Sequence, residues 1–272
     1  MPAVQLARLR RQTAELREFF PQPEVLLRRL RDLLEFYADR TRRPGQSGKP
    51  APLIRMYQAP RQVLRQIGID LQPQIHADPG TALALADLLW ADGWLETRLL
   101  AIDILAEIPL QDTVPTLTRM RAWAGDCLDT ELLDALFAVG RARLWGGEMK
   151  DFLHLIDEWA SSAELDTQKL ALRAISVLVA DPGFENLPVV MRLLQPYVRA
   201  PLARLEADTL QVIQALVRRS PLETAYFLQQ GLLASQDART ARLVRQSLPD
   251  FPVEVQQELK ARLREQRYSI SD

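Results

Sequence analysis

The chain has 272 residues, of which 47% are hydrophobic and 25% are charged, so it carries enough apolar material for a folded core and is not a disordered chain. Its single cysteine, Cys127, excludes an internal disulfide and a thiolate metal cluster, and only two histidines, His76 and His154, are present for metal or acid–base chemistry. We therefore expect neither a metal ion nor another cofactor.

The net charge of −1 conceals an uneven distribution. Residues 1–66 contain 14 basic and 6 acidic side chains (+8), residues 67–170 contain 7 and 18 (−11), and residues 171–272 contain 13 and 11 (+2). Affinity for a phosphate backbone follows local charge, so the N-terminal part favours a nucleic acid and the middle part opposes one. Nearly all the cations are arginines, which suits bidentate phosphate contacts, although a GC-rich genome would produce the same bias.

The N-terminal twenty residues carry charges too frequently for a signal sequence, and no stretch of about 18 uninterrupted apolar residues occurs anywhere. These two observations predict a cytoplasmic protein with no membrane partner.

Apolar residues recur at helical spacing from end to end, and no segment alternates as a strand does. Between Leu95 and Ile108, for example, apolar side chains follow one another at steps of three and four. The pattern, interrupted at proline, glycine and helix-start residues, predicts helices at 4–20, 24–42, 58–68, 79–91, 94–108, 112–124, 129–144, 149–160, 165–180, 185–198, 202–219, 221–234, 237–248 and 252–266.

Some connections between these helices have a clear chemical signature. Ser220 followed by Pro221 predicts a hydroxyl cap and a proline at the first helical position. Residues 41–51 (TRRPGQSGKPA) read as a flexible link with basic flanks, and His76 falls in a Gln/Asp/Pro loop.

Short connections force neighbouring helices to pack antiparallel, and pairs that recur about every 35–45 residues are typical of helical repeats. We therefore predict an all-α fold, a HEAT-like right-handed α-solenoid of about seven antiparallel helix pairs, curved with a concave groove. We expect a single domain over 1–272. Such grooves bind something long, such as a duplex or another protein's helix.

Three stretches resemble the AlkD-like DNA alkylation repair family of HEAT-like proteins. The first, LLWADGWLETRLLAI at 88–102, is similar to a family helix-pair junction through Trp90, Glu96, Arg98 and Ala101. The second, DTELLDALFAVG at 129–140, resembles a family helix that ends its motif on an aspartate, here Asp134. The third combines EWASS with LALRAISVL at 158–178.

Upstream, MYQAPRQVLRQI at 56–67 resembles the element that opens the family domain. The resemblance spans roughly 56–250. It leaves 1–55 as basic N-terminal helices and a loop, and 251–272 as a C-terminal helix and tail.

The resemblance implies a damaged duplex lying along a basic groove, with two tryptophans and an aspartate at the lesion. A carboxylate beside the deoxyribose stabilises the cationic character that develops as an alkylated purine leaves, and aromatic faces add cation–π contacts. By this resemblance Asp134 is the candidate catalytic residue of a DNA glycosylase, and excision would not require base flipping. The alternative is that Asp134 is an ordinary exposed helical acid.

The sequence departs from the family pattern at both aromatic positions. Thr130 stands four residues before Asp134, where the family has tryptophan, and Lys169 stands where the third stretch should open its helix with tryptophan. Whether this chain is an enzyme therefore stays open at the level of the sequence. Of the tryptophans present, Trp90 and Trp159 are expected to pack between helices, whereas Trp94 and Trp145 lie in predicted turns and are candidates to line the groove.

The candidate phosphate contacts are basic side chains at helical spacing or in basic runs. They are Arg28, Arg29, Arg42, Arg43, Arg61, Arg65, Lys169, Arg239, Arg242 and Arg245. A basic run is also commonly a solvated helix face with no ligand. Glu96 and Arg98, two positions apart, point in different directions and are expected to cap or bridge to adjacent helices.

The leading hypothesis is a protein that binds duplex DNA through backbone contacts, with base excision weak or lost. The alternative is a non-enzymatic scaffold whose acidic middle groove receives a basic protein segment.

Overall fold

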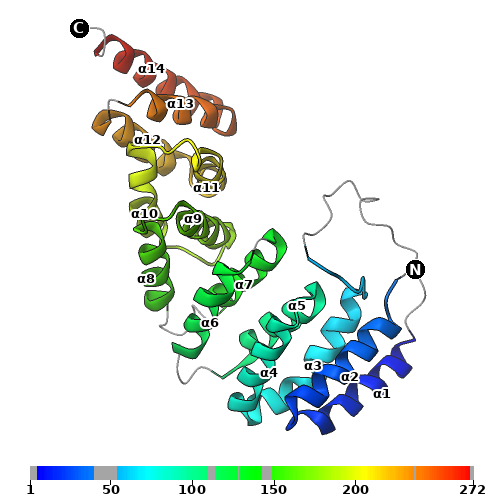
Figure 1. Ribbon diagram of the computed structural model, residues 1–272. Coiled ribbons are helices and arrows are strands. Elements are labelled where there is room, and N and C mark those ends of the chain that lie inside the picture. Colours follow the sequence, from blue (N-terminus) through cyan, green and yellow to red (C-terminus); the bar gives the residue numbers. More distant parts are fainter. Residues whose placement is uncertain are drawn as a thin grey trace. The chain divides into compact units, whose positions relative to one another are not determined.

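The computed structural model describes residues 5–39, 54–109, 114–127, 129–142, 149–235 and 237–269. Within these ranges the protein is all-α and forms fourteen α-helices that pack in sequential pairs (Figure 1). No helix in this part of the chain is both long enough and apolar enough to cross a membrane. The handedness, curvature and concave groove expected from the sequence stay predictions.

The chain divides into two compact units, Met1–Met149 and Lys150–Asp272. The helices of the first unit are α1 (Leu6–Glu15), α2 (Pro23–Phe36), α3 (Arg61–Ala77), α4 (Pro79–Ala91), α5 (Leu95–Glu107), α6 (Val114–Gly125) and α7 (Thr130–Ala142), with a 3-10 turn η1 (Leu16–Phe19) after α1. Helices α1, α3, α5 and α7 lie side by side in this order, and α2 packs against α4 in a second layer.

The second unit repeats this arrangement. It contains α8 (Met149–Ala160), α9 (Leu165–Ala180), α10 (Leu187–Arg199), α11 (Glu206–Arg219), α12 (Pro221–Ala234), α13 (Ala238–Ser247), the 3-10 turn η3 (Leu248–Asp250) and α14 (Val253–Ser269). Helix α11 packs between α9 and α13, and α12 packs against α10 and α14. The close contact of α12 with α10 needs a glycine, because a Cβ on Gly231 would lie 2.6 Å from Val198 Cγ1.

Each core is built from the apolar stripes that the sequence places at helical spacing. In the first unit the fully buried side chains include Leu30, Ile67, Leu71, Leu89 and Leu100. They fill the space between the two layers, and this burial is the main force that holds helices of such modest length.

Helix starts are fixed by capping side chains and by proline. Asp78 accepts a hydrogen bond from Thr81 N at 3.0 Å at the start of α4, and Asp237 accepts one from Arg239 N at 2.8 Å at the start of α13. Pro221 occupies the first position of α12 as predicted. The predicted Ser220 cap is wrong, because its hydroxyl donates to the Glu223 carboxylate at 2.9 Å instead of accepting a backbone N–H.

Several helix boundaries differ from those predicted. Helix α3 continues past 68 to Ala77, so His76 lies in its last turn and not in a loop. Helix α2 ends at Phe36, where the chain turns and Asp39 N donates to Gln58 O at 3.2 Å. Residues 202–205 form a turn before α11 and are not part of it.

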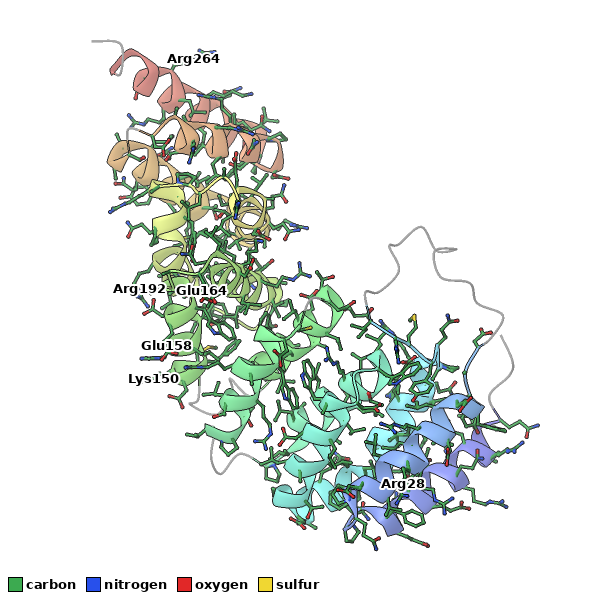
Figure 2. All side chains as sticks on the ribbon, in the orientation of Figure 1. Arg28, Lys150, Glu158, Glu164, Arg192 and Arg264 are labelled. Atoms are coloured by element: carbon green, nitrogen blue, oxygen red, sulfur yellow. The ribbon has the colours of Figure 1, made fainter. Side chains whose placement is uncertain are left out.

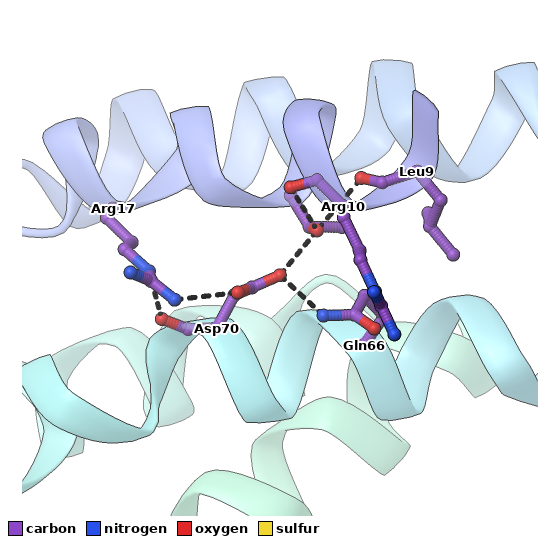
Figure 3. A network of polar contacts seen from close by, with 6 residues as sticks. Leu9, Arg10, Arg17, Gln66 and Asp70 are labelled. Atoms are coloured by element: carbon purple, nitrogen blue, oxygen red, sulfur yellow. Dashed lines mark hydrogen bonds and ion pairs between the residues drawn. The ribbon is translucent and has the colours of Figure 1, made fainter. Parts of the chain in front are cut away.

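A buried carboxylate joins α1 to α3. Asp70 accepts from Thr13 Oγ1 at 2.5 Å, Gln66 Nε2 at 2.9 Å and Arg17 Nη2 at 2.7 Å, while Arg17 Nε donates to the Asp70 carbonyl (Figure 3). Burial raises the pKa of Asp70, but the hydrogen bonds from Thr13 and Gln66 and the Arg17 guanidinium outweigh it, so the pKa lies below its usual value. The network is thus built for an ionised carboxylate.

An arginine performs a similar task in the second unit. The Arg219 guanidinium donates to the carbonyl oxygens of Val179 at 3.0 Å, Pro182 at 3.2 Å and Phe184 at 2.8 Å, and to that of Asp181. It therefore fastens the end of α11 to the connection between α9 and α10.

Candidate nucleic-acid interface

The N-terminal ends of α3, α5 and α7 come together at one edge of the first unit. Arg61, the first residue of α3, forms an ion pair with Glu131 in the first turn of α7. Residues 54–60, which lead into α3, contact the first turn of α5. Helix N-termini carry partial positive charge, but N–H groups at this edge already have partners: Asp129 accepts from Glu131 N and Leu132 N, and Arg55 O accepts from Leu95 N.

Glu96 fixes the segment 54–60 to α5. Its carboxylate is buried and accepts hydrogen bonds from Tyr57 N at 2.9 Å and Ala59 N at 3.1 Å. A single backbone bridge completes the attachment, with Leu95 N donating to Arg55 O at 2.8 Å. The sequence predicted that Glu96 caps or bridges to an adjacent helix; it instead binds an extended segment that precedes α3.

The tryptophans of this edge form two stacked pairs. Trp90 lies parallel to Trp123, with ring centroids 4.6 Å apart, and the Arg98 guanidinium sits 4.6 Å from the Trp90 centroid. Trp90 and Trp159 are both buried, as their predicted packing role requires. Arg98 is therefore held on an aromatic face.

Trp94 is partly exposed and stacks on Tyr57 at a centroid distance of 4.2 Å. Burial raises the Tyr57 pKa, as do the carboxylates of Asp92, Glu96 and Glu35, whereas the nearby Arg31 lowers it. The hydroxyl of Tyr57 therefore stays protonated at neutral pH. Trp94 remains a candidate groove aromatic, and Trp145 lies outside the described residues.

Helix α7 presents the candidate catalytic side chain. Asp134 is half-buried on α7, and Thr130 is exposed at the first position of the same helix. Asp129 caps the helix by accepting from Glu131 N at 2.9 Å and Leu132 N at 3.1 Å. The position where the resemblance requires tryptophan is thus a solvent-facing position occupied by a small polar side chain.

The predicted phosphate contacts in the first unit differ in their surroundings. Arg28 is exposed on α2 (Figure 2), and Arg65 is exposed on α3. Arg29 lies on α2 with its guanidinium 5.3 Å from the Phe19 centroid, and Arg61 is paired with Glu131. Arg42 and Arg43 fall outside the described residues.

In the second unit the candidate cations are all exposed, and several have intramolecular partners. Lys169 pairs with Asp166 at 3.2 Å and Arg242 with Glu206 at 3.1 Å. Arg239 Nη1 donates to Pro201 O at 3.4 Å, and Arg245 is exposed on α13. These ion pairs lower the charge available to a polyanion, although exposed pairs are individually weak.

Two further polar features were not predicted from the sequence. Arg31 on α2 reaches Asp92 in the turn before α5, and the Asp92 side chain is only 1% exposed. On α5, Asp103 borders a small apolar cavity between α3 and α5. Although Asp103 is an exposed residue, the apolar side chains around its carboxylate restrict hydration, and this desolvation together with the nearby Glu107 carboxylate raises its pKa to about 6. Arg31 and Asp92 are far apart in sequence, so no local pattern indicates their contact, whereas Asp103 and Glu107 are neighbours on one helix.

Among the residues that the structure describes, no group of three or more histidine, cysteine, aspartate or glutamate side chains is arranged to hold a metal ion. The candidate site therefore consists of arginines, stacked aromatics, carboxylates and helix N-termini. This chemistry suits binding of a phosphate backbone, with Asp134 as the carboxylate nearest to the expected catalytic pattern.

Comparison with known proteins agrees with these features. No curated protein and no solved structure matches the chain. Residues 54–201, more than half of the chain, match the model of the family described as DNA alkylation repair enzyme. The chain therefore belongs to the AlkD-like family of DNA alkylation repair enzymes.

Proposed function

We propose that this protein binds duplex DNA through its phosphate backbone and that its excision of alkylated bases is weak or absent. One observation carries the proposal. At the two positions where the family resemblance requires tryptophan, this chain carries Thr130 and Lys169, and both side chains are exposed.

The departing alkylated base carries a positive charge, which the protein must stabilise. A base alkylated on a ring nitrogen is cationic, and aromatic faces stabilise the cation as the glycosidic bond breaks. Threonine offers no π face, and the Lys169 ammonium repels a second cation. Asp134 alone would then stabilise the oxocarbenium character of the sugar, with less overall rate enhancement.

Binding is supported by the exposed arginines, among them Arg28 and Arg65. Each phosphate neutralised releases counterions, so the logarithm of the affinity falls linearly with the logarithm of salt concentration. A titration with plain and methylated duplexes should therefore give similar affinities and the same steep salt dependence. A strong preference for the methylated duplex would contradict binding through the backbone alone.

An excision assay tests the second half of the proposal. We expect little release of methylated purines by the wild-type protein and a clear gain in the double variant Thr130→Trp, Lys169→Trp, because both aromatic faces are restored. Asp134→Asn in that variant should abolish the gain. Efficient wild-type turnover that Asp134→Asn removes would show that catalysis was never lost.

A protein-interaction scaffold is the second candidate, because residues 67–170 carry a net charge of −11 and include the exposed carboxylates of Asp126 and Glu131. Some of these carboxylates already have partners within the protein, however. Asp87 pairs with Arg119 at 2.6 Å, and Asp129 caps α7. Tight binding of a basic peptide together with no DNA affinity at about 0.2 M salt would favour the scaffold.

A further inference from the structure

Within the part of the chain that the structure describes, α1, η1 and α2 form a face that no other helix lines. Between α1, η1 and α2 this face contains a groove of about 490 Å³. Its apolar lining comes from Leu16, Phe19, Leu33 and Phe36. Figure 1 shows α1 and α2 at the N-terminal end of the first unit, where the packed helices begin.

Aromatic side chains on this face are only partly covered. Phe36 is 54% exposed, and the Arg8 guanidinium lies 4.6 Å from its ring centroid. Phe19 is half-buried under Arg29. End faces of stacked helix pairs are normally polar, because an uncovered apolar end associates with other molecules. These rings therefore mark the face as a contact surface.

Charges along α1 and η1 change sign from one end to the other. Arg8 and Arg11 are followed by Glu15 and Glu18 at steps of three, four and three, so all four lie on one stripe. All four are exposed, and the one ion pair among them, Arg11 with Glu15 at 3.6 Å, is fully solvated. Two copies of such a stripe placed antiparallel bring basic ends opposite acidic ends.

We propose that this face binds a second copy of the chain, with α1 of one molecule antiparallel to α1 of the other. In a twofold arrangement Arg8 and Arg11 of each copy face Glu15 and Glu18 of its partner, while the phenylalanines fill the groove. A self-complementary surface of this kind is what an isologous dimer requires.

The same charges disfavour a nucleic acid or a basic peptide as the partner that binds this face. Glu15, Glu18 and Asp32 repel a phosphate backbone, and Arg8, Arg11 and Arg29 repel a basic peptide. The mixed pattern is complementary to a partner with mixed charges in the reverse order, which a second copy supplies.

The dimer should be weak. The helices that form the face are about 20 Å long, so the interface falls at the small end of specific protein–protein contacts. We expect association in the micromolar range, weakened by salt. This inference does not depend on DNA binding or on excision.

The test uses two complementary charge variants of the full chain, followed by sedimentation equilibrium at low salt. Arg8→Glu with Arg11→Glu makes the stripe wholly acidic, and Glu15→Arg with Glu18→Arg makes it wholly basic. Each variant alone should be monomeric at concentrations where the wild type dimerises. An equimolar mixture should form a heterodimer, because each end then meets its opposite charge.

Matched controls carry the same kinds of change on α14, with Lys260→Glu and Arg264→Glu in one protein and Glu254→Arg and Glu258→Arg in the other. Circular dichroism verifies that every variant keeps its helical content. A wild type that is monomeric throughout the micromolar range would overturn the proposal. So would a dimer that the α1 variants leave unchanged, or a mixture of the two that stays monomeric.

Discussion

Individual carboxylates illustrate how burial and partners decide the role of a side chain. Glu96 is buried and serves two backbone N–H groups, whereas Glu131 is exposed and engages Arg61. Asp103 has neither kind of partner close enough to offset its restricted solvation. Glu96 thus holds the segment 54–60, and Glu131 pairs with Arg61. Ionised Asp103, in contrast, is expected to destabilise the folded state.

Masking of Arg61 leads to a prediction about DNA affinity. Glu131→Gln removes the competing carboxylate and should raise duplex affinity about two- to fivefold at low salt, in keeping with the modest strength of exposed ion pairs. Fluorescence anisotropy with a labelled duplex measures the change. Asp126→Gln, which removes an exposed charge nearby in sequence, is the control for general electrostatics. Equal effects of both substitutions would mean that Arg61 is not a specific contact.

Asp103 leads to a prediction about pH. Its folded-state pKa of about 6 lies above the unfolded value of about 3.9, so its contribution to stability is present at low pH and is lost as pH rises through about 6. Asp103→Asn should therefore raise the thermal midpoint at pH 7.5 and have no such effect at pH 4. Thermal unfolding curves of the wild type and the variant at pH 7.5 and pH 4 measure this difference. A midpoint lowered at pH 7.5 would show that the carboxylate is stabilising.

The sequence predicted that the side chains of Glu96 and Arg98 point in different directions, but it did not identify the residues that they contact. The partners of Glu96 lie in residues 57–59, a segment outside any helix, and the partner of Arg98 is the ring of Trp90 across a turn. Helical periodicity indicates which face a residue occupies. It does not indicate which extended segment crosses that face.

Helix boundaries were predicted correctly where a local proline sets them. They were predicted incorrectly where tertiary contacts determine how far the helix extends. The helix predicted at 58–68 continues to Ala77, and Pro73 lies inside it. The missing N–H leaves the carbonyl of Ile69 without its helical partner, and Ile69 lies on the exposed side, where water can serve that carbonyl. Packing against α1 and α5 then outweighs the local cost.

The Asp70 network predicts how strongly α1 is held to α3. Asp70→Asn should lower the free energy of unfolding by about 1–3 kcal/mol at neutral pH, because hydrogen bonds to a charged group are lost. The low folded-state pKa means that this stabilisation is present above the unfolded pKa and disappears as pH falls through the folded value. Wild type and variant should thus converge in strong acid. Denaturant titrations across pH measure this, and a difference that persists below both pKa values would contradict it.

Arg219 allows a similar prediction for the second unit. Lysine keeps the charge but cannot direct several N–H groups at separate carbonyls, so Arg219→Lys should cost about 1–3 kcal/mol. Amide hydrogen exchange should increase mainly around residues 179–187. Arg218→Lys is the matched control, because Arg218 is exposed and its guanidinium donates only to a carbonyl of its own helix. Uniform faster exchange across the unit would show a general loss of stability.

At the scale of the molecule, the all-α fold and the family were both predicted from sequence and are confirmed. Regular apolar spacing and an ordered set of short motifs carry this information. The arrangement of Arg61 against Glu131 and of segment 54–60 against α5 depends on contacts between distant residues, which no local pattern encodes. The assignment of Asp134 and of the arginines to a DNA site stays a prediction.

The network around Asp70 also bears on how the protein can be dissected. The family match begins at residue 54, but two ligands of the Asp70 carboxylate, Thr13 and Arg17, precede it, and α9 inside the matched range packs against α11 beyond it. A recombinant fragment cut to 54–201 would lose the hydrogen bonds of Asp70 to Thr13 and Arg17, and it would expose the apolar side chains of α3 that pack against α1 and those of α9 that pack against α11. We expect it to be recovered as a loosely packed, aggregation-prone species, detectable by weak near-ultraviolet circular dichroism. The segment that matches the family model is therefore shorter than the segment that we expect to be needed for stable folding.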